Sequence, residues 1–290
     1  MAGIFFYEGQ CRMKEPVGRS RAERLADHML LTEKRKKTRI IFFDIDGTLI
    51  PFGEKDLRPG LKQALKQKQQ EGVKLFLATG RAPYFLPEFQ DFSFDGALCF
   101  NGGYCYDREG VIYRHPIRGE DIPVVVRNAK DLGRSVALAS AARFGSNFFE
   151  ENLEEYLHIS ENTCNVLKEY EAFEKEEIYQ MMIGATADED EALVKGTSSV
   201  MCARWWDRAV DIIPKDSGKD KAMEIVLSHF GFSVEESMAF GDGGNDLDMI
   251  RFAGIGVAMG NATKEVKAAA DYVALSAEED GVSRALLELF

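Results

Sequence analysis

Apolar runs and amphipathic segments alternate along most of the chain. The run "RIIFF" at 39–43 is typical of a buried strand, and "VKLFLA" at 73–78 and "GALCF" at 96–100 repeat the pattern. Between the first two runs, residues 57–72 predict a helix with a proline in its first turn and a glycine at its end. Alternation resumes over 209–290, which predicts a parallel sheet covered by helices on both faces.

The middle of the chain carries its own set of predicted strands and helices, enough for a separate α/β unit inserted into the first. We therefore expect the first part of a core at 39–115, the insert at 116–208 and the second part of the core at 209–290. Residues 1–38 are polar with scattered apolar positions and are interpreted as an N-terminal extension, within which Met29 is an alternative start.

Composition narrows the class of protein. The chain has 290 residues, 45% of them hydrophobic and 29% charged, as in ordinary globular proteins. A net charge of −12 disfavours nucleic acid and membrane surfaces as partners, and no apolar run approaches the roughly 18 residues of a membrane-spanning helix. The five cysteines never form Cys-x-x-Cys, so neither a zinc site nor a disulfide framework is expected. A cytoplasmic enzyme or binding protein is the default interpretation.

Polar side chains follow four of the predicted strands. Asp44 and Asp46 come after the first strand, Thr79 after the second, Asn101 after the third and Asp242 after "SMAFG". In an open parallel sheet, ligands bind beyond the carboxyl ends of the strands. The four strand ends therefore predict one site.

The acidic residues of this predicted site favour a divalent cation. In an extended segment Asp44 and Asp46 point to the same side, and two close carboxylates need a cation or a shared proton. With Asp242 they offer the oxygen ligands that Mg²⁺ prefers. An EF-hand calcium loop does not fit, because Gly47 is at the fourth loop position and Lys55 stands where the glutamate should be.

Two nucleotide-binding motifs are weighed and rejected. "SGKD" lacks the upstream glycine and the hydroxyl residue of a P-loop, and "GIGVAMG" has one residue too many for the dinucleotide fingerprint. We interpret the second as a strand followed by a turn.

Four segments, in order, resemble the motifs of haloacid dehalogenase (HAD) superfamily phosphatases. They are "DIDGT" from Asp44, "LATGR" from Leu77, Lys219 in "PKDSGKDKA", and "GDGGNDLDMI" from Gly241. More narrowly, "FNGGYCYD", "GVAMGNATKEVKAAADYV" and "EEDGVSRAL" resemble the Cof-type hydrolases. The resemblance covers 39–115 and 209–290, and it implies a Rossmann-like core with a parallel sheet plus an inserted α/β cap domain.

The resemblance also implies roles for the acidic residues. Asp44 would be the nucleophile that forms an aspartyl-phosphate, and Asp46 would protonate the leaving oxygen and then activate water. Mg²⁺ would be held by Asp44, the backbone carbonyl of Asp46 and Asp242.

Further groups are implied around the phosphate. The expected phosphate-binding groups are the side chains of Thr79, Lys219 and Asn245 and the backbone N–H groups of Ile45 and Gly80. Asn245 and Asp246 would order the metal site, and Asn101 is a weaker candidate. Lys215 is the rival of Lys219, but spacing favours Lys219.

These implications predict a Mg²⁺-dependent phosphatase that acts on small phosphorylated metabolites, such as sugar phosphates. A phosphomutase and a non-catalytic phosphate-dependent sensor are the alternatives. The segment "ARFGSNFFE" at 142–150 is the candidate substrate-facing hairpin, while Asp248, His115 and Arg143 are interpreted as mostly surface residues. The sequence names neither the substrate nor the oligomeric state.

Overall fold

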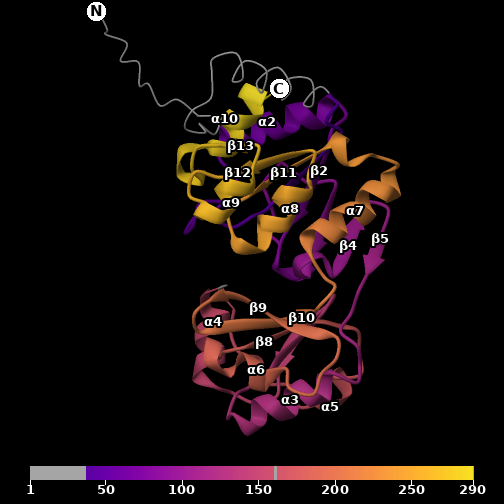
Figure 1. The fold of residues 1–290 in the computed structure, drawn as a ribbon, viewed down its shortest axis with the longest axis vertical. Helices are drawn as coiled ribbons and strands as arrows, with labels where there is room; N and C mark the ends of the chain where they lie inside the picture. Colours follow the sequence, from indigo (N-terminus) through magenta and orange to yellow (C-terminus); the bar gives the residue numbers. More distant parts are fainter. Residues whose placement is uncertain (1–36, 160–161, 290) are drawn as a thin grey trace, which may run out of the picture.

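The computed structural model describes residues 37–159 and 162–289 (Figure 1). Most of the predicted N-terminal extension, including Met29, lies outside the described residues. The first described part of the chain forms β1 (Ile40–Phe43), α2 (Pro59–Gln70), β2 (Lys74–Ala78), β3 (Gly96–Cys99), the short 3-10 helix η2 (Phe100–Gly102), β4 (Tyr104–Asp107) and β5 (Val111–Arg114).

The remaining elements follow in two groups. The middle part forms α3 (Ile122–Asp131), β6 (Ala137–Ser140), β7 (Phe144–Ser146), α4 (Glu151–Ile159), α5 (Tyr170–Phe173), β8 (Ile178–Ile183), α6 (Asp190–Leu193), β9 (Val200–Trp206) and β10 (Ala209–Pro214). The last part forms α7 (Lys219–Phe230), β11 (Ser237–Gly241), the 3-10 helix η5 (Gly244–Asp246), α8 (Leu247–Phe252), β12 (Ile255–Ala258), α9 (Lys264–Ala269), β13 (Tyr272–Val273) and α10 (Gly281–Leu289).

The core is an eight-stranded sheet in the order β13-β12-β11-β1-β2-β3-β4-β5. The strands from β13 to β3 are parallel, whereas β4 and β5 form the predicted antiparallel hairpin at one edge. The expected parallel sheet is thus confirmed. Because β1 lies between β11 and β2, the residues that follow these three strands lie at the same edge of the sheet.

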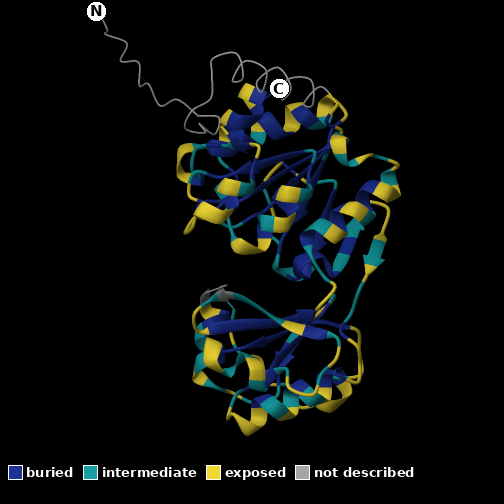
Figure 2. Cartoon of the chain, viewed as in Figure 1, coloured by how far each residue is buried: buried dark blue, intermediate teal, exposed yellow. Residues whose placement is uncertain are grey.

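Helices cover both faces of this sheet, so its central strands are apolar on both sides. Ile41 and Phe43 of β1 belong to the cluster that contains the buried residues of α2 and α10. Ile40 and Phe42 belong to the opposite cluster, with those of α7, α8 and α9. Figure 2 shows the strands buried and the outer helix faces exposed. This double burial makes β1 a rigid support for the residues that follow it.

The middle of the chain forms a second sheet, antiparallel throughout, in the order β7-β6-β8-β10-β9. One face packs on α3, α5 and α6 through residues such as Val125, Phe173 and Leu193. The other face carries α4 and lies toward the core (Figure 1). The inserted α/β unit that the sequence predicts is therefore present.

One expected boundary differs from the structure. The predicted boundary places 209–213 in the second part of the core, but β10 pairs with β8 and β9 in the second sheet. The physical reason is that β10 is buried along its whole length, so its apolar run has the pattern of a core strand. We propose that the chain returns to the core after Pro214, and the other domain boundaries stay predictions.

Within residues 37–159 and 162–289, no helix combines the length and the apolar character that a membrane crossing requires.

Candidate active site

The polar residues after β1, β2, β3 and β11 line one cavity of about 360 Å³. Asp44, Thr79, Asn101 and Asp242 all belong to its wall, as the strand-end argument expects. The opposite wall comes from the second sheet and α4, so the cavity lies between the two units.

Lys219, at the first turn of α7, joins the first and last motifs. Its Nζ donates to Asp44 Oδ1 at 2.7 Å and to Asp246 Oδ1 at 2.6 Å, and the residue is only 2% exposed. Burial by itself lowers the pKa of Lys219, but the carboxylates of Asp246 and Asp44 outweigh it and raise that pKa. The ammonium therefore stays charged and ties the two carboxylates together.

The pKa of Asp44 shifts in the same direction for a different reason. Burial is the main cause that raises it well above its usual range, and the charge of Asp246 adds to this. The charge and hydrogen bond of Lys219 act in the opposite direction without cancelling the rise. A carboxylate in this position gains from an additional positive charge nearby.

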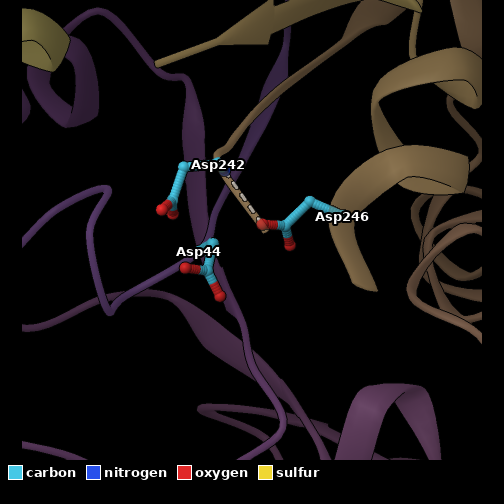
Figure 3. Close-up of side chains that lie close together, drawn as sticks. All are labelled: Asp44, Asp242 and Asp246. Atoms are coloured by element: carbon cyan, nitrogen blue, oxygen red, sulfur yellow. Dashed lines mark hydrogen bonds between the residues drawn. The ribbon is translucent and has the colours of Figure 1, made fainter. Parts of the chain in front are cut away.

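Figure 3 shows the side chains of Asp44, Asp242 and Asp246 lying close together, and their carboxylates offer oxygen atoms that lie within 4.8 Å of each other. Asp246 already accepts hydrogen bonds at Oδ2 from the backbone N–H groups of Asp242, at 3.0 Å, and Gly243, at 2.9 Å. Since Lys219 donates to its other oxygen, Asp246 accepts three hydrogen bonds from the described residues, more than Asp44 or Asp242, and acts as a scaffold. Asp44 and Asp242 are therefore the carboxylates best placed to hold a cation.

The carboxylate of Asp242 is oriented from two sides. Thr48 Oγ1 donates to its Oδ1 at 2.8 Å, and Asn261 Nδ2 donates to its Oδ2 at 3.0 Å. Burial raises the pKa of Asp242 to about 6, although the hydrogen bond from Thr48 opposes the shift. Asn261 also donates to the Gly47 carbonyl at 2.8 Å, so it fixes two segments at once. Sequence reasoning missed Asn261, which lies in the quoted run "GVAMGNATKEV" without an evident partner.

The fit to a hard divalent cation rests on this donor set. All donors are oxygen atoms, the two available carboxylates lie close together, and burial of each favours a bound positive charge. The side chain of Asp46 lies outside the cluster, so Asp46 would contact the cation through its backbone carbonyl and not through its carboxylate.

Asp46 is instead paired with Arg81. Nε of Arg81 donates to Asp46 Oδ2 at 2.8 Å and Nη2 donates to Oδ1 at 2.6 Å, while Nη1 donates to the Phe85 carbonyl at 3.0 Å. Both side chains are partly exposed at the cavity wall. Sequence analysis assigns no role to Arg81, although this residue closes the quoted "LATGR" motif.

Gly80 and Ile45 are predicted to bind phosphate through their backbone N–H groups only. The lack of a side chain at Gly80 leaves room for Asn101, since a Cβ at position 80 would lie 3.2 Å from Asn101 Nδ2. Ile45 turns its side chain into the core and is fully buried. Thr79 lines the cavity, and its Oγ1 accepts from the Arg81 N–H at 3.1 Å. Phosphate binding by these groups stays a prediction.

Asn101 occupies a strained turn. Its backbone has φ 52° and ψ 37°, Phe100 before it has φ 52°, and Gly102 after it has φ 95°. Left-handed conformations of non-glycine residues are costly and cluster at functional sites. Asn245 Nδ2 donates to Asn101 Oδ1 at 3.1 Å, and both line the cavity. The structure thus brings the weaker candidate Asn101 into the site.

Other residues named from the sequence lie outside the cavity wall. They are Lys215, His115, Arg143 and Asp248. Lys215 donates to the Ser198 carbonyl at 3.2 Å, whereas its rival Lys219 is buried between two carboxylates.

The segment 142–150 does not contribute to the cavity wall of the described chain. Its Phe144 packs against Tyr84 and Phe85, with ring centroids 6.1 and 5.0 Å apart. The wall on that side comes instead from β6, β8, β9, β10 and α4. A glutamine and an aspartate within the apolar runs "YQMMI" and "AVDII" were the signals that sequence reasoning passed over.

Comparison with known proteins settles the family. The family model described as haloacid dehalogenase-like hydrolase matches residues 41–286. The chain belongs to this family. This HAD-like chain is 29% identical over 258 residues to the putative phosphatase YkrA of Bacillus subtilis. The match covers 87% of this chain and 98% of that protein.

Two further matches are more informative about chemistry. The pyridoxal phosphate phosphatase YbhA of Escherichia coli is 28% identical over 261 residues, covering 81% of this HAD-like chain and 93% of that protein. The HAD subclass IIB sugar phosphatase BT4131 shares 31% identity with a TM-score of 0.76, covering 87% of this chain and 100% of that structure. The predicted fold, a HAD core with a cap, and the predicted class of enzyme, a phosphoric monoester hydrolase, are confirmed.

Proposed function

We propose that this protein is a cytoplasmic, Mg²⁺-dependent phosphatase that hydrolyses small phosphorylated metabolites, such as sugar phosphates, through an aspartyl-phosphate on Asp44. The observation that carries the proposal is the pair Asp44 and Asp242 at one wall of a cavity of about 360 Å³, with the buried Lys219 bound to Asp44. The named activities of relatives on pyridoxal phosphate and sugar phosphates support a small substrate.

Asp44 and Asp242, with the Asp46 carbonyl, are the residues that would hold Mg²⁺. When bound, this ion would offset the repulsion between the attacking carboxylate and the phosphate oxygens. Lys219 occupies Asp44 Oδ1, so the other oxygen, Oδ2, is the one left to attack phosphorus.

The reaction then needs two proton transfers by one residue. As Asp44 Oδ2 bonds to phosphorus, the bond to the leaving oxygen breaks, and that oxygen takes a proton from the Asp46 carboxyl. In the second step Asp46 removes a proton from a water molecule that attacks phosphorus, which releases inorganic phosphate and restores Asp44. One oxygen of Asp46 must exchange its bond to Arg81 for these partners during the cycle, while the bond to the other oxygen keeps the carboxylate oriented.

The proposal is tested with p-nitrophenyl phosphate and Mg²⁺, with release of inorganic phosphate as the measurement. Asp44→Asn should abolish turnover, because the amide is no nucleophile, while the matched control Asp248→Asn should retain it. Asp248 is an exposed acid outside the cavity wall. Full activity of Asp44→Asn would overturn the assignment of the nucleophile.

The same assay separates the two alternatives. Transfer of the phosphoryl group within one sugar phosphate, without free phosphate, would indicate a phosphomutase. A phospho-Asp44 that persists for hours in mass spectra of the intact protein would indicate a sensor. A panel of phosphorylated metabolites then identifies the substrate.

A further inference from the structure

The wall of the cavity opposite Asp44 is one face of the antiparallel sheet. Ala139, Gln180, Met182, Ala203 and Asp211 contribute to it from four neighbouring strands. The pairings Ala139–Gln180, Met182–Asp211 and Ala203–Asp211 put these residues on a common face. Most of this face is small or apolar, and two polar residues interrupt it.

Those two residues, Gln180 and Asp211, are buried to an unusual degree for polar side chains. Gln180 is 5% exposed and Asp211 is 4% exposed. Asp211 accepts hydrogen bonds from Tyr156 Oη of α4 and from the Gln180 side chain. Burying polar groups is costly unless they are hydrogen-bonded. Apolar residues could supply nearly the same packing, so packing alone does not account for this polar pair.

The pair is also incompletely satisfied. Since the amide of Gln180 donates to Asp211, its carbonyl oxygen Oε1 is an acceptor, and this buried atom has no hydrogen-bond partner among the described residues. An unpaired buried acceptor costs the desolvation of the group. A donor from a bound molecule would recover that cost.

We infer that Gln180 and Asp211 form a recognition subsite for a hydrogen-bond donor, a hydroxyl or amino group, on the leaving group of the substrate. The inference rests on the proposed phosphatase function and deepens it. Both residues belong to the cavity wall across from Asp44, and Gln180 Oε1 is their unpartnered acceptor within the described part of the chain. The favoured substrate is thus a phosphate ester whose other end carries hydroxyl or amino groups and no second anion.

The charges of the wall support the exclusion of a second anion. Its described cations are Arg81 and Arg204. Arg81 is bound to Asp46, and Arg204 is paired with Asp190 and donates to the carbonyls of Ala185, at 2.8 Å, and Ala209, at 3.0 Å. A second phosphate or carboxylate beside Asp211 would therefore meet like charge without a free cation.

The test compares a sugar-alcohol phosphate with the alkyl phosphate of the same chain length. For the wild-type protein we expect a higher kcat/KM for the hydroxylated ester. Gln180→Met keeps the length of the side chain and removes both hydrogen-bonding groups, so it should lower the ratio of the two kcat/KM values about tenfold. Asp211→Asn, close to the wild-type shape, should lower the same ratio and serves if Gln180→Met does not fold.

The matched control is Tyr170→Phe. It also removes a buried hydrogen bond of the second unit, from Tyr170 Oη to the Val136 carbonyl at 3.0 Å, but lies outside the cavity wall. We expect it to leave the ratio unchanged. A ratio unaffected by both Gln180→Met and Asp211→Asn would overturn the inference alone, as would a preference for esters with a second anionic group. Failure to hydrolyse any ester would overturn the proposed function as well.

Discussion

The guanidinium of Arg81 donates two hydrogen bonds to the carboxylate of Asp46, from Nε to Oδ2 at 2.8 Å and from Nη2 to Oδ1 at 2.6 Å. This fork connects the segment after β2 to the segment after β1. Partly exposed ion pairs contribute little to stability, so the pair serves mainly to orient the carboxylate. Arg81 is therefore a positioning residue for the proposed acid and base.

Arg81→Gln should lower kcat for p-nitrophenyl phosphate about tenfold or more, with a smaller change in KM, because Asp46 loses its fixed orientation. Arg81→Lys should restore part of the loss. The control Arg134→Gln breaks a fork of the same geometry, to Glu189 at 2.9 Å for both contacts, outside the cavity wall. Unchanged kcat in Arg81→Gln, measured by steady-state kinetics, would contradict the positioning role.

The sequence predicts the core and its site well because both follow from local patterns. An apolar run that ends in polar residues identifies a strand and its carboxyl end, and parallel strands bring those ends together. Asp44 and Asp242 are nearly 200 residues apart in the chain, yet their carboxylates lie in one cluster. The order of the motifs identified the family correctly.

The second sheet was less predictable, for a physical reason. Its strands are apolar on both faces, one toward the helices and one toward the cavity, so pattern alone does not tell which strand pairs with which. This explains the misplaced β10 and the choice of 142–150 over Gln180 and Asp211. Arg81 and Asn261 were missed because their partners come from other segments and depend on tertiary structure.

Lys219→Met should destabilise the fold, since it leaves Asp44 and Asp246 buried together without their shared ammonium. Loss of one member of a buried ion pair costs roughly 3–5 kcal/mol. Urea denaturation measures the change in the free energy of unfolding. The double variant with Asp246→Asn should recover part of it, and Lys215→Met, at an exposed lysine, should change it little. Equal free energies of unfolding for Lys219→Met and Lys215→Met would refute the prediction.

Mg²⁺ should raise the melting temperature of the protein. A ligand present at about 100 times its Kd stabilises by about 2.7 kcal/mol when it binds only the folded state. Asp242→Asn should remove most of this shift, and EDTA should abolish hydrolysis by the wild type. Asp248→Asn is the control, being an exposed acid at the start of α8. A Mg²⁺-induced shift of equal size in Asp242→Asn, measured by scanning fluorimetry, would argue against the proposed ligand set.

Gly47→Ala should weaken Mg²⁺ binding. A Cβ at this position would lie 2.5 Å from Asp242 Oδ2, and Gly47 has φ +80°, which strains any other residue. The control Gly53→Ala shares the backbone strain, with φ +88°, but its Cβ would meet nothing within 4 Å. We expect a larger Kd for Mg²⁺, by calorimetry, only in Gly47→Ala. The same loss in both variants would mean that backbone strain alone is responsible.

Asp211 should make stability depend on pH. Burial raises its pKa from 3.8 to about 6, against the opposing hydrogen bonds from Tyr156 and Gln180. Between these values the folded state binds more protons than the unfolded state, so stability falls as pH rises. The contribution is fully present below about pH 4 and is lost as pH passes through about 6.

Asp211→Asn removes this contribution and should flatten the curve. Because two pKa units correspond to roughly 3 kcal/mol, the variant should gain up to that amount over the wild type between pH 4 and 7. Urea denaturation at several pH values, with Mg²⁺ present to keep Asp242 ionised, measures the difference. Asp248→Asn, whose carboxylate is exposed, should follow the wild-type curve. Parallel curves for Asp211→Asn and wild type would show that the buried carboxylate does not titrate in this range.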